Sequence, residues 1–125
     1  MAEILVIDDD RAVRDSIKLM LEKRGHRIHT AADGSKGLLC VEERAIDLVI
    51  TDVLMPGQEG IETIRSLRRR AGRMPILAIS GGGQTGFRDA LDAARLLGAN
   101  DTLPKPFKMQ ELVDKVSGLL KAASA

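Results

Sequence analysis

The sequence predicts a doubly wound α/β domain in which five parallel strands alternate with five helices. Short uninterrupted aliphatic runs at Ile4–Ile7, Leu48–Thr51 and Ile76–Ile79 are typical of strands that are buried on both faces of a sheet. Between these runs, apolar residues recur every three or four positions, as in amphipathic helices. Strands that alternate with helices are expected to form one parallel sheet with helices on both faces.

Each element of the amino-terminal half follows from local pattern. The helix after Ile4–Ile7 ends near Gly25, and Arg27–Ala31 alternates as expected for a strand at a sheet edge, with His26 and His29 exposed. Asp33-Gly34 then turns the chain into a second helix. The apolar residues that define these two helices are Val13, Ile17, Met20 and Leu21, and then Leu38 and Val41.

The carboxyl-terminal half continues the alternation. Pro56-Gly57 stops the chain after the third strand, Pro75 opens the fourth, and Asp101–Leu103 forms a weak fifth. The third helix shows Ile61, Ile64 and Leu67 on one face; the fourth shows Phe87, Leu91, Ala94 and Leu97; the fifth shows Leu112, Val113, Val116, Leu119 and Leu120.

Length and composition favour one domain, residues 1–125, with no membrane segment and no nucleic-acid partner. A chain of 125 residues can bury a single core, and its formal charge is only +1. The amino terminus lacks the long apolar run of a signal peptide or membrane span. Cys40 is alone, so a reducing cytoplasm is expected. One basic cluster is expected to be a solvated helix face: Arg65, Arg68, Arg69, Arg70 and Arg73.

Acidic residues follow two of the predicted strands. Asp8-Asp9-Asp10 comes directly after the first strand, and Asp52 follows the third. Because the carboxyl ends of parallel strands meet at one edge of a sheet, Asp8, Asp9 and Asp52 are expected to converge there. Carboxylates this close repel unless a cation lies among them, and hard oxygen ligands suit Mg²⁺. Simpler roles exist, since Asp9 or Asp10 could cap the following helix and Asp52 could cap a turn.

Four marks together resemble the receiver domains of two-component response regulators. They are Asp8-Asp9, Asp52 followed by Met55-Pro56-Gly57, Ser80 after the fourth strand, and Lys105-Pro106-Phe107. Each mark is weak alone, but their order and spacing hold across nearly the whole chain. The resemblance implies the flavodoxin-like receiver fold with strand order 2-1-3-4-5, in a single-domain, chemotaxis-regulator-like type.

The resemblance also implies roles for particular residues. Asp52 would accept a phosphoryl group, while Asp8 and Asp9 would hold Mg²⁺ or Mn²⁺ together with Asp52 and the backbone carbonyl of Leu54. The Ser80 hydroxyl would donate to a phosphoryl oxygen, and Lys105 would pair with Asp52 or the phosphoryl group, with a cis Lys105–Pro106 bond. Without the resemblance, Ser80 would be a turn residue before three glycines, and Lys105 would be solvated.

By the same resemblance the chain is a signalling switch and not a turnover enzyme. The donor would be a sensor histidine kinase or a histidine phosphotransfer protein, and the protein would be cytoplasmic, as a monomer or weak dimer. Its contact face would be the fourth helix, fifth strand and fifth helix. Because the chain ends at Ala125, output is expected by protein contact, by phosphorelay or through a domain outside this sequence.

Three positions depart from the receiver pattern. Thr102 stands where many receivers carry an aromatic residue that turns inward on activation, so coupling through ring rotation is in doubt. Leu54 and Gly82 stand where receivers often carry polar side chains that orient a hydrolytic water. We therefore expect self-dephosphorylation to have no side-chain help from these two sites.

Three rival interpretations fit the sequence less well. Gly81–Gly86 satisfies the dinucleotide motif G-x-G-x-x-G, but only one strand and one helix follow it, too little for a nucleotide-binding half. Asp8 could be the nucleophile of a phosphatase, but the cap domain and catalytic loop are missing. A docking module that no longer accepts phosphate is disfavoured because Asp8, Asp9, Asp52, Ser80 and Lys105 form a complete set.

Overall fold

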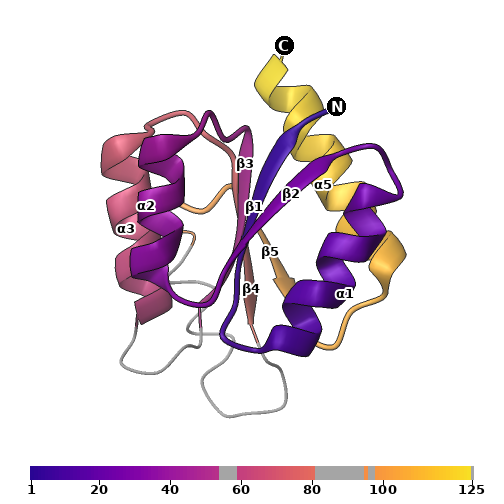
Figure 1. The fold of residues 1–125 in the computed structure, drawn as a ribbon. Helices are drawn as coiled ribbons and strands as arrows, with labels where there is room; N and C mark the ends of the chain where they lie inside the picture. The colour runs from indigo at the N-terminus through magenta and orange to yellow at the C-terminus, as the bar shows by residue number, and fades with distance from the viewer. Residues whose placement is uncertain (54–58, 81–94, 96–97, 125) are drawn as a thin grey trace.

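A computed structural model describes residues 1–53, 59–80, 95 and 98–124 (Figure 1). Its strands form one parallel sheet in the order β2-β1-β3-β4-β5. This confirms the predicted fold class and strand order. The strands are β1 (Glu3–Ile7), β2 (Arg27–Ala31), β3 (Leu48–Asp52), β4 (Ile76–Ser80) and β5 (Asp101–Pro104).

Helices cover both faces of the sheet. Figure 1 shows α1 (Arg11–Glu22) and α5 (Met109–Ser124) on one side and α2 (Gly34–Glu43) and α3 (Glu59–Arg70) on the other. The predicted fourth helix falls on residues 87–97, which lie outside the described residues except for Arg95. No helix within the described parts of the chain is long and apolar enough to cross a membrane.

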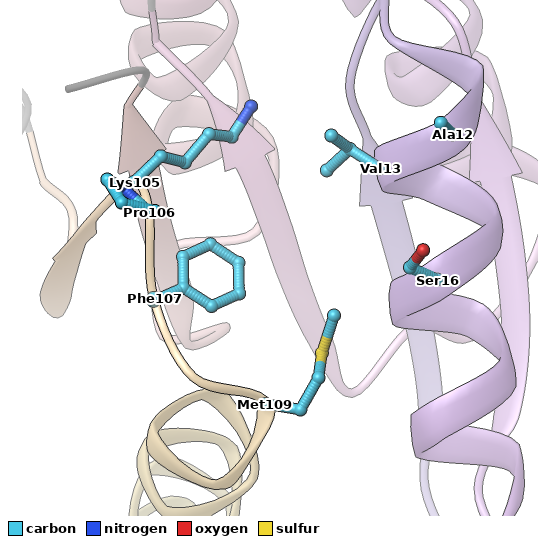
Figure 2. A pocket seen from close by; sticks show the side chains of 7 residues that line it. All are labelled: Ala12, Val13, Ser16, Lys105, Pro106, Phe107 and Met109. Atoms are coloured by element: carbon cyan, nitrogen blue, oxygen red, sulfur yellow. The ribbon is translucent and has the colours of Figure 1, made fainter. Parts of the chain in front are cut away.

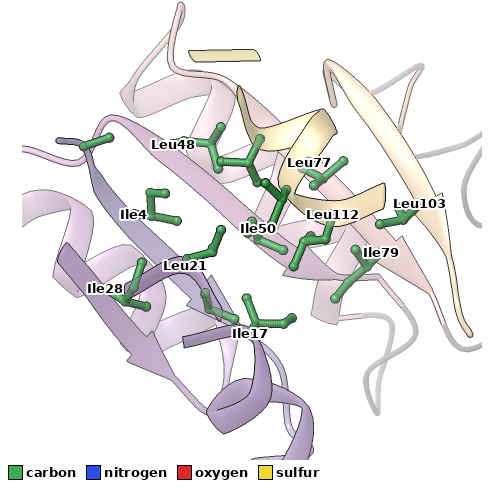
Figure 3. Packing of buried hydrophobic residues seen from close by; sticks show 14 residues of the cluster. Ile4, Ile17, Leu21, Ile28, Leu48, Ile50, Leu77, Ile79, Leu103 and Leu112 are labelled. Atoms are coloured by element: carbon green, nitrogen blue, oxygen red, sulfur yellow. The ribbon is translucent and has the colours of Figure 1, made fainter. Parts of the chain in front are cut away.

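The sheet separates two apolar clusters. Figure 3 shows the first, in which alternate residues of the central strands, such as Ile4 and Ile50, pack against Ile17 of α1 and Leu112 of α5. The second lies under α2 and α3 and includes Leu5 and Val49, with Cys40 packed against it. The central strands β1, β3 and β4 are therefore covered on both faces, as their uninterrupted aliphatic sequences predict.

Aspartates begin the first two helices. The Asp10 carboxylate accepts the backbone N–H groups of Ala12 and Val13 at 2.9 and 3.3 Å, and Asp33 accepts that of Lys36 at 2.9 Å. These bonds satisfy donors that a helix start leaves without partners. One of the three consecutive acids is thus a helix cap, and Asp8 and Asp9 need another explanation.

Three expectations about surface residues are wrong. His26 was expected to be exposed, but it is half-buried and its Nδ1 accepts the Ala2 N–H at 3.2 Å. His29 was expected to be exposed, but its side chain is only 16% exposed and its Nε2 lies 2.8 Å from Glu3 Oε1. Arg68 was expected to lie on a solvated face, but it is partly buried and donates to the carbonyls of Gly72, Met74 and Gly98. All three residues find partners outside their own helix or strand, which periodicity alone does not reveal.

Candidate functional site

The register of the sheet brings four predicted side chains to one edge. Ile7 pairs with Thr51, so the next residues, Asp8 and Asp52, lie at the carboxyl ends of the neighbouring strands β1 and β3. Asp52 pairs with Ile79, one residue before Ser80. Ser80 pairs with Pro104, one residue before Lys105. The strand ends β1, β3, β4 and β5 therefore each deliver a polar side chain to the carboxyl-terminal edge of the sheet.

Asp8, Asp9 and Asp52 form a cluster that could hold a metal ion. One carboxylate oxygen from each lies within 4.8 Å of those of the others. Asp8 is fully buried and Asp52 is 4% exposed, whereas Asp9 is exposed. An all-oxygen donor set at a half-open edge fits Mg²⁺, which uses one or two carboxylates and keeps several waters.

Lys105 joins two of these acids. Its ammonium lies 2.9 Å from Asp8 Oδ2 and 3.0 Å from Asp52 Oδ2, and its side chain is 19% exposed. Burial alone would lower the pKa of Lys105, but hydrogen bonds and charge attraction from Asp8 and Asp52 outweigh it and raise the pKa. Lys105 thus carries a positive charge between the carboxylates, and the bond to Pro106 is cis.

The Ser80 hydroxyl is buried and has no hydrogen-bond partner among the described residues. Ser80 is fully buried, and its Oγ is the buried side-chain atom without a hydrogen bond among the residues described. Its backbone is fixed, because Lys105 N donates to Ser80 O at 2.6 Å. An unsatisfied buried donor is unfavourable, so this hydroxyl is suited to an acceptor that arrives at the strand edge.

The sequence analysis missed two groups that hold Asp8 in place. Arg14 Nη1 donates to the Asp8 carbonyl at 2.6 Å, and the Asp10 backbone N–H donates to Asp8 Oδ1 at 2.9 Å. Arg14 lies one helical turn after Asp10, and helical side chains point back toward the amino terminus, so its spacing could have indicated this contact. Together the two donors fix the turn between β1 and α1.

A groove of about 510 Å³ opens beside the acidic cluster, between α1 and the segment after β5. In Figure 2, Val13 of α1 faces Phe107 and Met109 across the groove, and the Lys105 side chain extends along its edge. The groove is lined by Ala12, Val13, Ser16, Lys105, Pro106, Phe107 and Met109.

Several predicted residues lie outside the described residues. They include Leu54 and its backbone carbonyl, Met55-Pro56-Gly57 and the Gly81–Gly86 motif. Thr102, at the expected aromatic position, is described: its hydroxyl accepts from Arg95 Nη2 at 3.2 Å. A short polar residue at this position therefore bonds to a charged side chain instead of filling an apolar pocket.

Comparisons with known proteins agree with this geometry. The family model described as the response regulator receiver domain matches residues 4–117. "Response regulator MprA" from Mycobacterium sp. strain KMS is 40% identical over 122 residues, 97% of this chain and 51% of the relative. The chain thus spans about half the length of the curated relatives it matches.

Solved structures of similar size also match the fold. A response regulator receiver domain protein from Clostridium thermocellum is 31% identical with a TM-score of 0.90, and the match covers 99% of this chain and 98% of that one. A CheY-like receiver domain protein from Methanospirillum hungatei JF-1 is 26% identical with a TM-score of 0.90, covering 99% and 97%.

Proposed function

Because the chain belongs to the response regulator receiver domain family, we propose that it is a phosphorylation-activated switch whose Asp52 accepts a phosphoryl group. The donor is the phosphohistidine of a sensor histidine kinase or of a histidine phosphotransfer protein. The observation that carries this proposal is the Lys105 ammonium, held between Asp8 and Asp52 at the carboxyl ends of the strands. The arrangement places positive charge where a transferred phosphoryl group would need it.

The chain's own groups supply positioning and charge. An oxygen of the Asp52 carboxylate attacks phosphorus in line with the departing atom, and the electron pair leaves with the donor. Lys105 neutralises charge on the phosphoryl oxygens, and the Ser80 hydroxyl, which has no partner among the described residues, donates to one of them. Each group is fixed by the sheet, so little reorganisation is needed at the moment of transfer.

Asp8, Asp9 and Asp52 are the residues that would hold Mg²⁺, or Mn²⁺, with the backbone carbonyl of Leu54 as a further ligand. Such an ion, when bound, reduces repulsion between the anionic nucleophile and the anionic donor. Asp8 suits a holding role, since its Oδ1 accepts from Asp10 N and its Oδ2 from Lys105 Nζ. As the nucleophile, Asp8 would have to release one of its two carboxylate oxygens from these contacts.

The switch is proposed to work by stoichiometric modification and not by turnover. Residues 1–125 act as one domain, as a monomer or weak dimer, in the cytoplasm. Phosphorylation would alter a contact face made of the fourth helix, β5 and α5, read by a protein target. The Arg95 contact to Thr102 would lie on this proposed face, and it joins Arg95 to β5 without an aromatic ring.

Exposure to acetyl phosphate with Mg²⁺, followed by intact mass measurement, tests the proposal. The wild-type chain should gain one phosphoryl group, and Asp52→Ala should gain none. Asp114→Ala, which removes an exposed carboxylate of α5, is the matched control and should be modified like the wild type. Equal modification of Asp52→Ala, or an unmodified wild type that is folded and binds Mg²⁺, would contradict it.

A further inference from the structure

We propose that the groove beside Lys105 is a subsite for the departing part of a small phosphodonor, and that it favours acyl phosphates with an apolar acyl chain. The inference rests on the proposed function, because it concerns the donor that delivers a phosphoryl group to Asp52. It goes further by naming a class of small molecule and the residues that select it.

The groove and the acidic cluster share one side chain. The Lys105 ammonium contacts Asp8 and Asp52, while the same residue lines the groove. Figure 2 shows the Lys105 side chain above Phe107 in this view and extending toward α1, with Val13 on the opposite wall. A molecule that places its phosphoryl group at the ammonium therefore has the groove directly beside it.

The direction of transfer points the departing group away from Asp52. In-line displacement puts the departing oxygen on the side of phosphorus opposite to the attacking carboxylate oxygen. Asp52 lies at the end of β3 and is 4% exposed, so the departing group must emerge from the strand edge toward the surface. Among the described residues, the groove that opens beside this edge is walled by the first turns of α1 and the segment Lys105–Met109.

The lining of the groove is chemically suited to a hydrocarbon chain. Val13, Phe107 and Met109 supply apolar surface, and Pro106 and Ala12 add to it. The polar contribution comes from the Ser16 hydroxyl and from Lys105, whose ammonium is held by the two carboxylates. The volume of about 510 Å³ falls within the range of small-molecule sites.

The chemistry balances without a further reactant. A carboxylate oxygen of Asp52 forms a bond to phosphorus, and the bond between phosphorus and the acyl oxygen breaks. The electron pair stays on that oxygen, so the donor departs as a carboxylate anion. One carboxylate is consumed and one is released, and no proton has to move.

Rates of Asp52 modification by butyryl phosphate and acetyl phosphate, measured with Mg²⁺ by intact mass, test the subsite. Butyryl phosphate has two more methylenes, and each fully buried methylene is worth roughly a fourfold change. Because the groove is open to solvent, butyryl phosphate should react about three- to tenfold faster at subsaturating concentration.

Two variants of α1 test whether the preference for butyryl phosphate depends on the groove. Ser16→Phe fills the groove from an exposed position and should bring the butyryl-to-acetyl ratio close to one. Leu19→Phe adds a ring at a position that is 57% exposed and does not line the groove, so it should keep the wild-type ratio.

The outcomes separate the subsite from the switch itself. If neither donor modifies Asp52, the proposed function fails. If both donors modify the wild type at the same rate, or if Ser16→Phe keeps the butyryl preference, only the subsite is overturned. A ratio lost equally in Leu19→Phe also overturns it, because the effect would then not depend on the groove.

Discussion

The two ends of the β-sheet differ in how their polar groups are paired. At the amino-terminal end of β4, Arg68 donates to Gly72 O, Met74 O and Gly98 O, and Asn100 Oδ1 accepts from both Arg68 Nη2 and Ile76 N. At the carboxyl-terminal end, carboxylates crowd together and the Ser80 hydroxyl has no partner among the described residues. The amino-terminal end pairs its polar groups with one another, whereas the carboxyl-terminal end gathers carboxylates, an ammonium and a hydroxyl at an edge that a ligand can reach.

This difference suggests that residues at one end of the sheet mainly stabilise the fold, whereas residues at the other end mainly serve phosphoryl uptake. The Arg68 network closes the α3 end and the turn before β5, and Gly98, at φ 127°, is packed so closely against the Arg68 side chain that a Cβ atom would lie 2.9 Å from Nε. Substitutions at that end should therefore change the free energy of unfolding. Substitutions at the carboxyl end should change phosphoryl uptake first.

The largest expected effect is on the rate of phosphoryl uptake, at the carboxyl-terminal end of the sheet. Lys105→Ala removes the ammonium between Asp8 and Asp52, and loss of one preorganised charge-stabilising donor typically costs about 100-fold or more in rate. Phosphoryl uptake from acetyl phosphate, followed by intact mass over time, measures it. Lys115→Ala, which removes a lysine paired with Asp101 instead, should leave the rate unchanged. A Lys105→Ala rate within a factor of two of the wild type would refute the assigned role.

The next effect is on stability at the opposite end. Arg68→Ala leaves several carbonyls without a charged donor and should lower the free energy of unfolding by about 2–3 kcal/mol. Urea denaturation measures the change, and the exposed neighbour Arg69→Ala should alter it by less than about 0.5 kcal/mol. Phosphoryl uptake by folded Arg68→Ala should match the wild type. If Arg68→Ala lost most of its phosphoryl uptake while its free energy of unfolding stayed unchanged, the proposed difference in role between the two ends of the sheet would be contradicted.

Ser80→Ala should lower the rate of phosphoryl uptake without lowering the free energy of unfolding. The hydroxyl is a neutral donor, weaker than an ammonium, so the rate should fall by only about tenfold. The free energy of unfolding should stay equal or rise by up to about 1 kcal/mol, because the substitution removes a buried hydroxyl that has no hydrogen-bond partner among the described residues. Ser66→Ala on α3 serves as the control for both measurements. A clear loss of stability in Ser80→Ala would show that the hydroxyl already has a structural partner.

The smallest effect is a pH dependence at the amino-terminal end. Burial, with a smaller contribution from the charged amino terminus, lowers the pKa of His26 below its ordinary value of 6.5, and its Nδ1 accepts Ala2 N–H at 3.2 Å. Since the folded pKa is the lower one, the unfolded chain binds more protons. The stabilisation is therefore full above about pH 6.5 and is lost as the pH falls toward the folded pKa.

Urea midpoints of the wild type and His26→Gln at about pH 7.5 and about pH 5 measure this term. The wild type should lose slightly more stability than the variant on acidification. Identical losses would show that His26 titrates alike in the folded and unfolded chain.

Sequence patterns could predict the strands and the meeting of Asp8, Asp9 and Asp52, because a parallel sheet gathers its carboxyl ends by geometry alone. The sheet order came only from the resemblance to receiver domains. They could not predict the Arg68 network, since its acceptors are carbonyls, which every residue carries. They also missed Arg14 and the pairing of His29 with Glu3, which depend on side-chain direction across strands. The groove beside Lys105 was missed for a related reason: its walls come from segments about ninety residues apart in the chain.

Chemical identification of the modified residue tests the central claim most directly. After reaction with acetyl phosphate and Mg²⁺, borohydride reduction converts an aspartyl phosphate to homoserine, and peptide sequencing by mass spectrometry locates it. The account predicts homoserine at position 52 alone. Homoserine at position 8 or 9, or a phosphate that resists reduction because it is held by a serine or histidine, would contradict it.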